Sequence, residues 1–195
     1  MNPDPRLTQL HEWIKETLGN IKYSLTAVSG DASFRRYFRL ASKDYLYIAV
    51  DSPPKKEKNE EFVNVTHLLE AEGLPVPHIH YSSLDFGFFL LSDLGDELLL
   101  NILNENNVDE LYIKALNALS IIQQTPATSL PKNDEQLLLQ EMELFKEWFL
   151  TKYLSQQLTN DENQILSYTY KNLAKKEIQQ TQEYVHRDFH SLNLN

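Results

Sequence analysis

The spacing of apolar residues changes near Asp93, and this change constrains the fold more than any other feature of the sequence. Before Asp93, short segments with strand-like alternation surround two helical segments. After it, apolar residues recur at helical spacing until Tyr184. A strand-rich half followed by a helix-rich half predicts an α+β fold with two lobes, which we place at residues 1–95 and 96–195.

The first half is expected to form one antiparallel sheet of five strands with two helices. Alternating segments between turn residues predict strands at residues 21–28, 34–40, 45–50, 78–81 and 86–92. Helical spacing predicts a helix over residues 6–18, which Gly19 ends, and a second helix over residues 57–72. We expect the second helix to pack on the sheet because one of its faces is apolar.

The second half is expected to be a partial, mainly helical lobe. Helices are predicted over residues 108–125, 135–149 and 161–174. Phe145 and Phe149 lie in phase with other apolar residues on the second of these helices. This pattern predicts that both rings are core residues.

Composition restricts the class of protein. The chain has 195 residues, and an apolar content of 42% is enough to build a core. The chain contains no cysteine, which excludes disulfides and fits a reducing compartment, so we expect a cytoplasmic protein. No signal peptide or membrane segment is expected, because the most apolar run covers only residues 86–91. A net charge of −10 opposes binding to nucleic acid and also repels nucleotide phosphates, which need Mg²⁺ and local cations beside them.

The most informative motif is the segment of His186, Arg187 and Asp188, with Asn193 five residues after the Asp. In phosphotransferase catalytic loops with this spacing, the Asp accepts the proton of the acceptor hydroxyl and the Asn holds Mg²⁺. The spacing assigns Asp188 as the catalytic base and Asn193 as a metal ligand. The alternative for Asp188 is a turn carboxylate that caps the loop, and His186 is expected to pack the loop as a hydrogen-bond donor.

A second metal-binding Asp should follow such a loop, but the chain ends at Asn195 before one appears. Asn193 is a neutral ligand that needs a carboxylate beside it to hold Mg²⁺. We therefore expect a chain that is truncated at its C-terminus and shows little or no kinase activity alone. Its helices are expected to expose apolar faces and to make the chain poorly soluble.

Five segments together carry a resemblance to a known family. They are residues 30–40 (GDASFRRYFRL), 50–54 (VDSPP), 73–77 (GLPVP), 141–149 (EMELFKEWF) and 185–190 (VHRDFH). In this order they resemble the bacterial aminoglycoside phosphotransferase-like kinases, most of all the anomeric N-acetylmuramate/N-acetylglucosamine kinases of cell-wall recycling. The resemblance implies a protein-kinase-like two-lobe fold and phosphorylation of the C1 hydroxyl of an amino sugar. ATP, Mg²⁺ and the amino sugar are the implied partners, with no nucleic acid or membrane.

The resemblance also points to residues that contact the nucleotide. Gly30, Asp31 and Ser33 occupy the place of a loop that covers phosphates, although an ordinary hairpin turn is the alternative because the loop has one Gly. Arg35 and Arg36 are neighbours on a predicted strand and therefore point to opposite faces. One of them is expected to face the nucleotide, and the other solvent or an acidic partner.

Other positions replace or complete the kinase pattern. The third predicted strand contains no Lys, so phosphate contacts must come from elsewhere. Glu60 and Glu61 are the helix positions that would face this strand, or they form a solvated face. Asp93 and Leu94 resemble a hinge whose backbone binds adenine, and a plain lobe-connecting turn is compatible with that role.

The acceptor site is assigned to a short segment of the second half. Glu141, Glu147 and Trp148 are the sugar-binding candidates, because hydroxyl-rich ligands need acceptors beside an aromatic platform. Leu192 replaces the Arg usual in this family's loop, which puts one substrate or phosphate contact in question. Two classes of function are open: a small-molecule kinase, whose acceptor is an amino sugar or else an aminoglycoside, choline or homoserine, and a non-catalytic remnant or pseudokinase that binds nucleotide or a partner.

Overall fold

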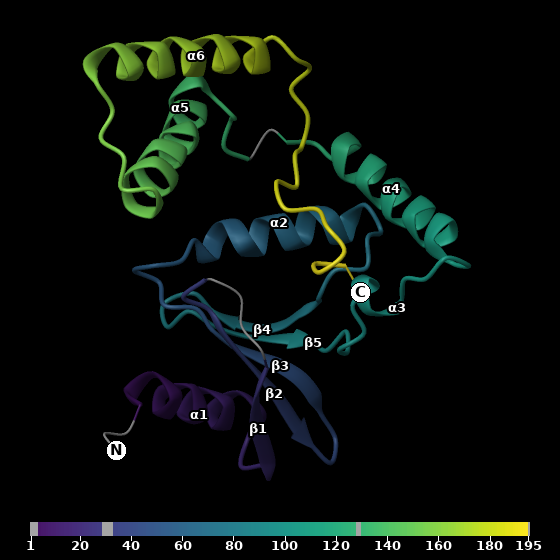
Figure 1. Ribbon diagram of the computed structural model, residues 1–195. Helices are drawn as coiled ribbons and strands as arrows, with labels where there is room; N and C mark the ends of the chain where they lie inside the picture. Colours follow the sequence, from purple (N-terminus) through teal and green to yellow (C-terminus); the bar gives the residue numbers. More distant parts are fainter. Residues whose placement is uncertain (1–3, 29–32, 128–129, 195) are drawn as a thin grey trace. The chain divides into compact units, whose positions relative to one another are not determined.

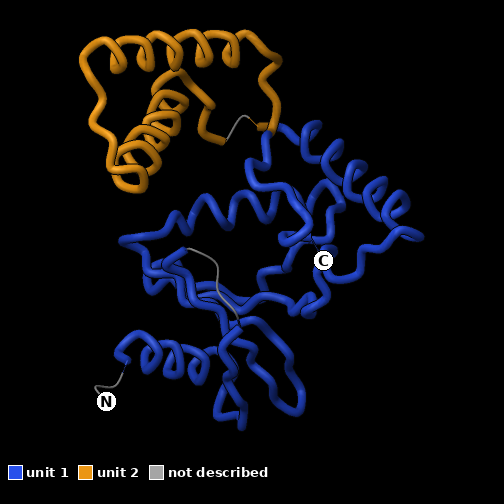
Figure 2. Tube along the Cα trace, viewed as in Figure 1, with its two compact units in different colours: residues 1–126, 185–195 blue, residues 127–184 orange. Residues whose placement is uncertain are grey.

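The computed structural model describes residues 4–28, 33–127 and 130–194. The chain forms two compact units, one of residues 1–126 with 185–195 and one of residues 127–184 (Figure 2). The segment with the catalytic motif therefore belongs to the same unit as the sheet. The lobe boundary at residue 95 stays a prediction.

A single antiparallel sheet is the framework of the first unit (Figure 1). Its strands run in the order β1-β2-β3-β5-β4, which confirms the predicted sheet of five antiparallel strands. The strand bounds are β1 Tyr23–Val28, β2 Arg36–Ser42, β3 Leu46–Asp51, β4 Ile79–Ser83 and β5 Phe88–Ser92. Strand β5 lies inside the sheet, and four of its five residues are buried because both sheet faces are covered there.

Helices α1 (Pro5–Leu18) and α2 (Asn59–Ala71) cover opposite faces of the sheet (Figure 1). Successive residues of a strand point to opposite faces, so β3 and β5 contribute to two separate apolar clusters. Leu10 and Ile14 of α1 pack with Leu40, Ala49, Phe88 and Leu90. Phe62 and Val63 of α2 pack with Val50, Phe89 and Leu91. The prediction that the second helix packs on the sheet is confirmed.

The junction between β3 and β5 depends on Gly87. Its φ is +69°, and a Cβ there would lie 1.9 Å from the backbone oxygen of Ser52. The Ser52 N–H donates to the Gly87 carbonyl oxygen at 2.7 Å. Because only glycine permits this close approach, Ser52 is held firmly at the end of β3.

The remaining helices agree with the predicted helical half. They are α3 Leu99–Ile102 and α4 Val108–Gln124 in the first unit, and α5 Glu135–Leu144, the π-helix η1 Phe145–Tyr153 and α6 Asn160–Ile178 in the second. Short α3 was not predicted from the sequence. Among the helices of the described residues, none is both long and apolar enough to cross a membrane.

The helix predicted over residues 135–149 differs from the observed structure. Its α-helical part ends at Leu144, and a π-helix continues to Tyr153. Along this segment Phe149 stacks on Phe145 at 5.3 Å and on Tyr153 at 5.8 Å between ring centroids. Phe145 and Phe149 remain 46% and 45% exposed, so the prediction that they are core residues is wrong.

Candidate active site

The catalytic-loop segment is docked on the short helix α3. The Leu99 N–H donates to the Leu194 carbonyl oxygen at 2.7 Å, and the Leu100 N–H donates to the Ser191 carbonyl oxygen at 3.0 Å. The first N–H groups of a helix lack partners within the helix. The loop supplies those partners for α3, and this contact fixes the loop beside the sheet-containing part of the first unit.

Asp188 and Asn193 are in direct contact within this loop. Asn193 Nδ2 donates to Asp188 Oδ2 at 2.8 Å and to the Asp188 carbonyl oxygen at 3.0 Å. The Asp188 side chain is nevertheless 65% exposed. The two residues that the motif spacing assigns to catalysis are therefore adjacent, and the carboxylate stays open to a ligand.

His190 is a further partner of Asp188 that sequence reasoning missed. Its Nε2 lies 3.1 Å from Asp188 Oδ1, and its Nδ1 accepts the Leu192 N–H at 3.2 Å. The same Nε2 lies 3.3 Å from Asn193 Nδ2, so Asp188, His190 and Asn193 gather at one point of the loop. The sequence signal that could have indicated this contact is the position of His190, two residues after Asp188. Asn193 thus donates to one carboxylate oxygen of Asp188, and His190 lies beside the other.

The backbone before Asp188 adopts an uncommon conformation. Arg187 has a φ of +70°, a region that residues other than glycine seldom adopt and that recurs at functional sites. His186 packs its ring edge-on against Phe189 at 5.4 Å. Its Nδ1 is buried without a hydrogen-bond partner among the described residues. The predicted packing role of His186 is met by a ring contact, and the predicted hydrogen bond is not found there.

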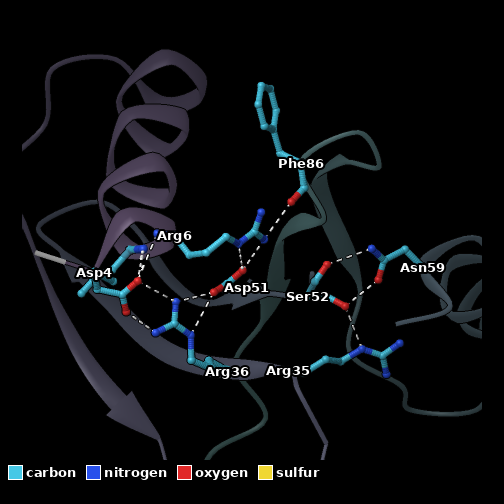
Figure 3. Close-up of polar contacts among 9 residues, drawn as sticks. Asp4, Arg6, Arg35, Arg36, Asp51, Ser52, Asn59 and Phe86 are labelled. Atoms are coloured by element: carbon cyan, nitrogen blue, oxygen red, sulfur yellow. Dashed lines mark hydrogen bonds and ion pairs between the residues drawn. The ribbon is translucent and has the colours of Figure 1, made fainter. Parts of the chain in front are cut away.

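Arg36 is fully engaged on the α1 face of the sheet (Figure 3). Its guanidinium donates to Asp51 and Asp4, and Asp51 also accepts from Arg6. The hydrogen bond from Arg36 lowers the pKa of Asp4 to about 2. Asp51 is completely buried, so its charge depends on these two arginines. Arg36 is thus the member of the pair that faces acidic partners.

Arg35 points to the other side and reaches Ser52 (Figure 3). Its Nε donates to Ser52 Oγ at 3.0 Å, and its guanidinium carbon lies 4.8 Å from the centre of the Phe62 ring. Its two Nη groups have no hydrogen-bond partner among the residues that the structure describes. The Arg35 guanidinium is therefore held at its Nε edge by the described residues.

The end of β2 nearest the predicted phosphate loop is held by Glu57. Ser33 Oγ and the Phe34 N–H both donate to Glu57 Oε1 at 3.0 Å. Gly30 and Asp31, the other predicted loop residues, lie outside the described residues. Glu60 and Glu61 are exposed. Glu57 is the first residue of the helix predicted over residues 57–72 and was not singled out from the sequence, and in the structure it precedes α2.

The segment after β5 is anchored through Arg39 of β2. Arg39 donates to both carboxylate oxygens of Asp93, at 2.5 and 3.1 Å, and to both of Asp96, at 2.7 and 2.8 Å. Hydrogen bonds from Arg39 lower the pKa values of Asp93 and Asp96. The Asp93 side chain is thus occupied in bracing the turn, while Leu94 is 46% exposed. The adenine-binding role of this segment stays a prediction.

The family model described as "Phosphotransferase enzyme family" matches residues 24–195. The chain belongs to the phosphotransferase enzyme family. The match covers β1 from its second residue, the other four strands and the catalytic loop.

Similar curated proteins of this family come from three bacteria. Each is named N-acetylmuramate/N-acetylglucosamine kinase. The Pseudomonas putida protein is 37% identical over 98% of this chain and 60% of its own length, and the Pseudomonas aeruginosa protein is 35% identical over 100% and 61%. The Neisseria meningitidis protein is 31% identical over 97% and 58%. The chain thus spans about 60% of the length of the curated relatives it matches.

One solved structure shares the fold of this phosphotransferase. It is a protein of Ralstonia eutropha JMP134 that is described provisionally as an aminoglycoside phosphotransferase. The two structures align with a TM-score of 0.52 at 14% identity, over 72% of this chain and 47% of the other. This alignment confirms the predicted kinase-like α+β fold.

The predicted sugar-binding residues of this phosphotransferase belong to the second unit. Trp148 is 57% exposed, and Lys152 Nζ lies 3.5 Å from the centre of its ring and 3.4 Å from Glu147 Oε1. Glu141 is on helix α5 and has an interaction partner. The sugar-binding role of these residues stays a prediction, as does the metal-binding role of Asn193. Within the described ranges, no three His, Cys, Asp or Glu residues gather as a metal site.

Proposed function

We propose that this protein transfers the γ-phosphoryl group of ATP to the C1 hydroxyl of N-acetylmuramate or N-acetylglucosamine, which yields a sugar 1-phosphate. The observation that carries the proposal is the exposed Asp188 carboxylate, one oxygen of which accepts from Asn193 while the other lies beside His190. The names of the curated relatives support an amino sugar as the acceptor.

Asp188 would act on the acceptor hydroxyl. A general base must lie within hydrogen-bond reach of the proton that it removes, and an exposed carboxylate on a docked loop meets this requirement. His190 and Asn193 would fix the direction of its lone pairs. Phosphoryl transfer depends mainly on positioning and electrostatic stabilisation, so an oriented base is what this loop has to provide.

The residues beside Asp188 also fit a magnesium ion. Mg²⁺ in nucleotide sites is held by one or two side-chain oxygens together with substrate phosphates and water. Asn193 with its amide oxygen would hold the ion, with Asp188 adjacent to it. The bound ion would neutralise charge on the phosphates. Within the described residues, no three His, Cys, Asp or Glu side chains gather as a metal site. We therefore expect turnover to need residues from the part of the relatives that this chain does not span.

The two neighbouring arginines should differ when each is replaced by Ala. Arg35→Ala should raise the KM for ATP by roughly tenfold or more, because it removes a cation with free Nη donors. Arg36→Ala should leave the KM for ATP nearly unchanged and should lower the melting temperature, since Arg36 holds Asp4 and Asp51. Steady-state kinetics and thermal unfolding of both variants test this difference. Equal effects on the KM for ATP would contradict it.

The acceptor is tested with a protein of the relatives' length, in which the C-terminal part of the Pseudomonas putida relative follows residue 194. ATP turnover should require N-acetylglucosamine or N-acetylmuramate. The 6-deoxy analogue of N-acetylglucosamine should remain a substrate and the 1-deoxy analogue should not, because only the latter lacks the reacting hydroxyl. Phosphorus NMR should show the phosphate on C1.

Several outcomes bear on the alternatives. Phosphorylation of the 1-deoxy analogue would contradict transfer to C1. Turnover with only choline, homoserine or an aminoglycoside would replace the amino sugar as acceptor. ATP binding without turnover on any of these acceptors would favour a non-catalytic protein. The 195-residue chain, assayed in parallel, should show little or no turnover.

A further inference from the structure

We propose that Glu57 is a positioning residue for ATP, which holds the β2 end of the phosphate loop and presents Arg35 to the phosphates. This inference rests on the proposed kinase function for its ligand, and it extends that function to a residue with no assigned role. It concerns nucleotide binding and is independent of which acceptor is used.

Glu57 contacts three consecutive residues at the start of β2. Its Oε1 accepts from Ser33 Oγ and from the Phe34 N–H, both at 3.0 Å. Its Oε2 lies 3.5 Å from Arg35 Nε. The Glu57 side chain is only 14% exposed, so solvent screens these interactions less than it would on an open surface. One carboxylate therefore ties residues 33–35 to a single point.

Glu57 is itself held by a rigid turn between β3 and α2. The N–H groups of Lys56 and Glu57 both donate to the Pro53 carbonyl oxygen, at 2.9 and 3.1 Å. Pro53 and Pro54 restrict the backbone of this turn. Two further hydrogen bonds attach the turn to α2, since Ser52 Oγ donates to Asn59 Oδ1 at 2.5 Å and Asn59 Nδ2 donates to the Ser52 carbonyl oxygen at 2.9 Å.

The same turn determines how Arg35 is presented. Ser52 accepts from Arg35 Nε, the Phe62 ring covers the guanidinium, and Glu57 balances its charge. These contacts use the Nε edge and leave the Nη donors, which match phosphate oxygens in pairs. Lys56 adds a second cation on this edge, with its Nζ 4.0 Å from the centre of the Phe34 ring. Because β3 carries no Lys and the chain has a net charge of −10, Arg35 and Lys56 are the cations that we assign to the ATP phosphates.

The test uses the lengthened protein with Glu57→Ala, Glu57→Gln and the control Glu72→Gln, which removes an exposed carboxylate at the other end of α2. ATP affinity is measured by fluorescence titration with an ATP analogue, and KM and kcat are measured with N-acetylglucosamine. Glu57→Ala should weaken ATP binding by roughly tenfold and raise the KM for ATP similarly, with kcat at saturating ATP close to wild type. Glu57→Gln should recover part of the loss because the amide oxygen still accepts from Ser33 and Phe34, and Glu72→Gln should behave as wild type.

A double-mutant cycle with Arg35→Ala separates positioning from a general structural effect. If Glu57 acts through Arg35, much of the effect of Glu57→Ala should disappear in the Arg35→Ala background. Additive losses, or a Glu57→Ala variant with wild-type ATP affinity, would overturn the inference, as would a wild-type protein that does not bind ATP. Loss of ATP affinity in Glu57→Ala without phosphorylation of any amino sugar would refute the proposed acceptor and leave this inference standing. Amino-sugar phosphorylation with an unchanged KM for ATP in Glu57→Ala would refute the role of Glu57 and leave the proposed acceptor standing.

Discussion

Replacing Asp188 with Asn should lower the kcat of the lengthened protein with N-acetylglucosamine by about 10²–10⁴-fold. The amide has almost the shape of the carboxylate but cannot take the proton of the acceptor hydroxyl. The KM for ATP should change little, because Asp188 is assigned to the acceptor and not to the nucleotide. Steady-state kinetics with each substrate varied separately measure both quantities.

The matched control is Asp85→Asn, which changes an exposed carboxylate in the turn between β4 and β5. It should retain wild-type kcat. His190→Gln should fall between the two variants, since Asp188 would keep its charge but lose one group that orients it. A wild-type kcat for Asp188→Asn with both amino sugars would rule out the assigned role. A kcat loss accompanied by a large drop in melting temperature would instead indicate that Asp188 holds the loop.

The second large effect is expected on stability, from Asp51→Ala. The Asp51 side chain is 1% exposed and lies between Arg6 and Arg36, which are 29% and 40% exposed (Figure 3). Removing one partner from a buried ion pair typically costs about 3–5 kcal/mol. The partial exposure of the arginines lowers this figure through solvent screening, so we expect a loss of about 2–3 kcal/mol in the free energy of unfolding.

The loss of stability can be followed at α1, which the ion pairs of Asp51 with Arg6 and Arg36 anchor to the sheet. Trp13 on α1 lies 5.8 Å from Phe88 between ring centroids, and the chain's other tryptophan is Trp148. In a Trp148→Phe background, tryptophan fluorescence during denaturant unfolding reports on α1. Asp44→Ala, in an exposed turn, is the charge-matched control and should unfold as the background does. Coincident unfolding curves for Asp51→Ala and the control would contradict an anchoring role for these ion pairs.

The sequence by itself determined the features that depend on neighbouring residues. Strand-like segments bounded by turn residues located all five strands, because the residues that favour strands and those that favour turns are neighbours in the chain. The spacing of Asp188 and Asn193 singled out two residues of one loop, and the structure shows them in contact. The opposite orientation of Arg35 and Arg36 followed from local strand geometry.

Only the tertiary structure decided which partners these residues meet. Arg36 pairs with Asp51, 15 residues away, and with Asp4, 32 residues away, while Arg39 braces Asp93 across 54 residues. Such contacts arise when distant strands and helices pack, and no spacing in the chain encodes them. The stacked, half-exposed rings of Phe145 and Phe149 likewise follow from a π-helix, whose hydrogen bonds differ from those of an α-helix while the apolar pattern looks the same. Periodicity therefore identified the elements, and packing determined which of the two arginines pairs with the buried Asp51 and which one reaches Ser52.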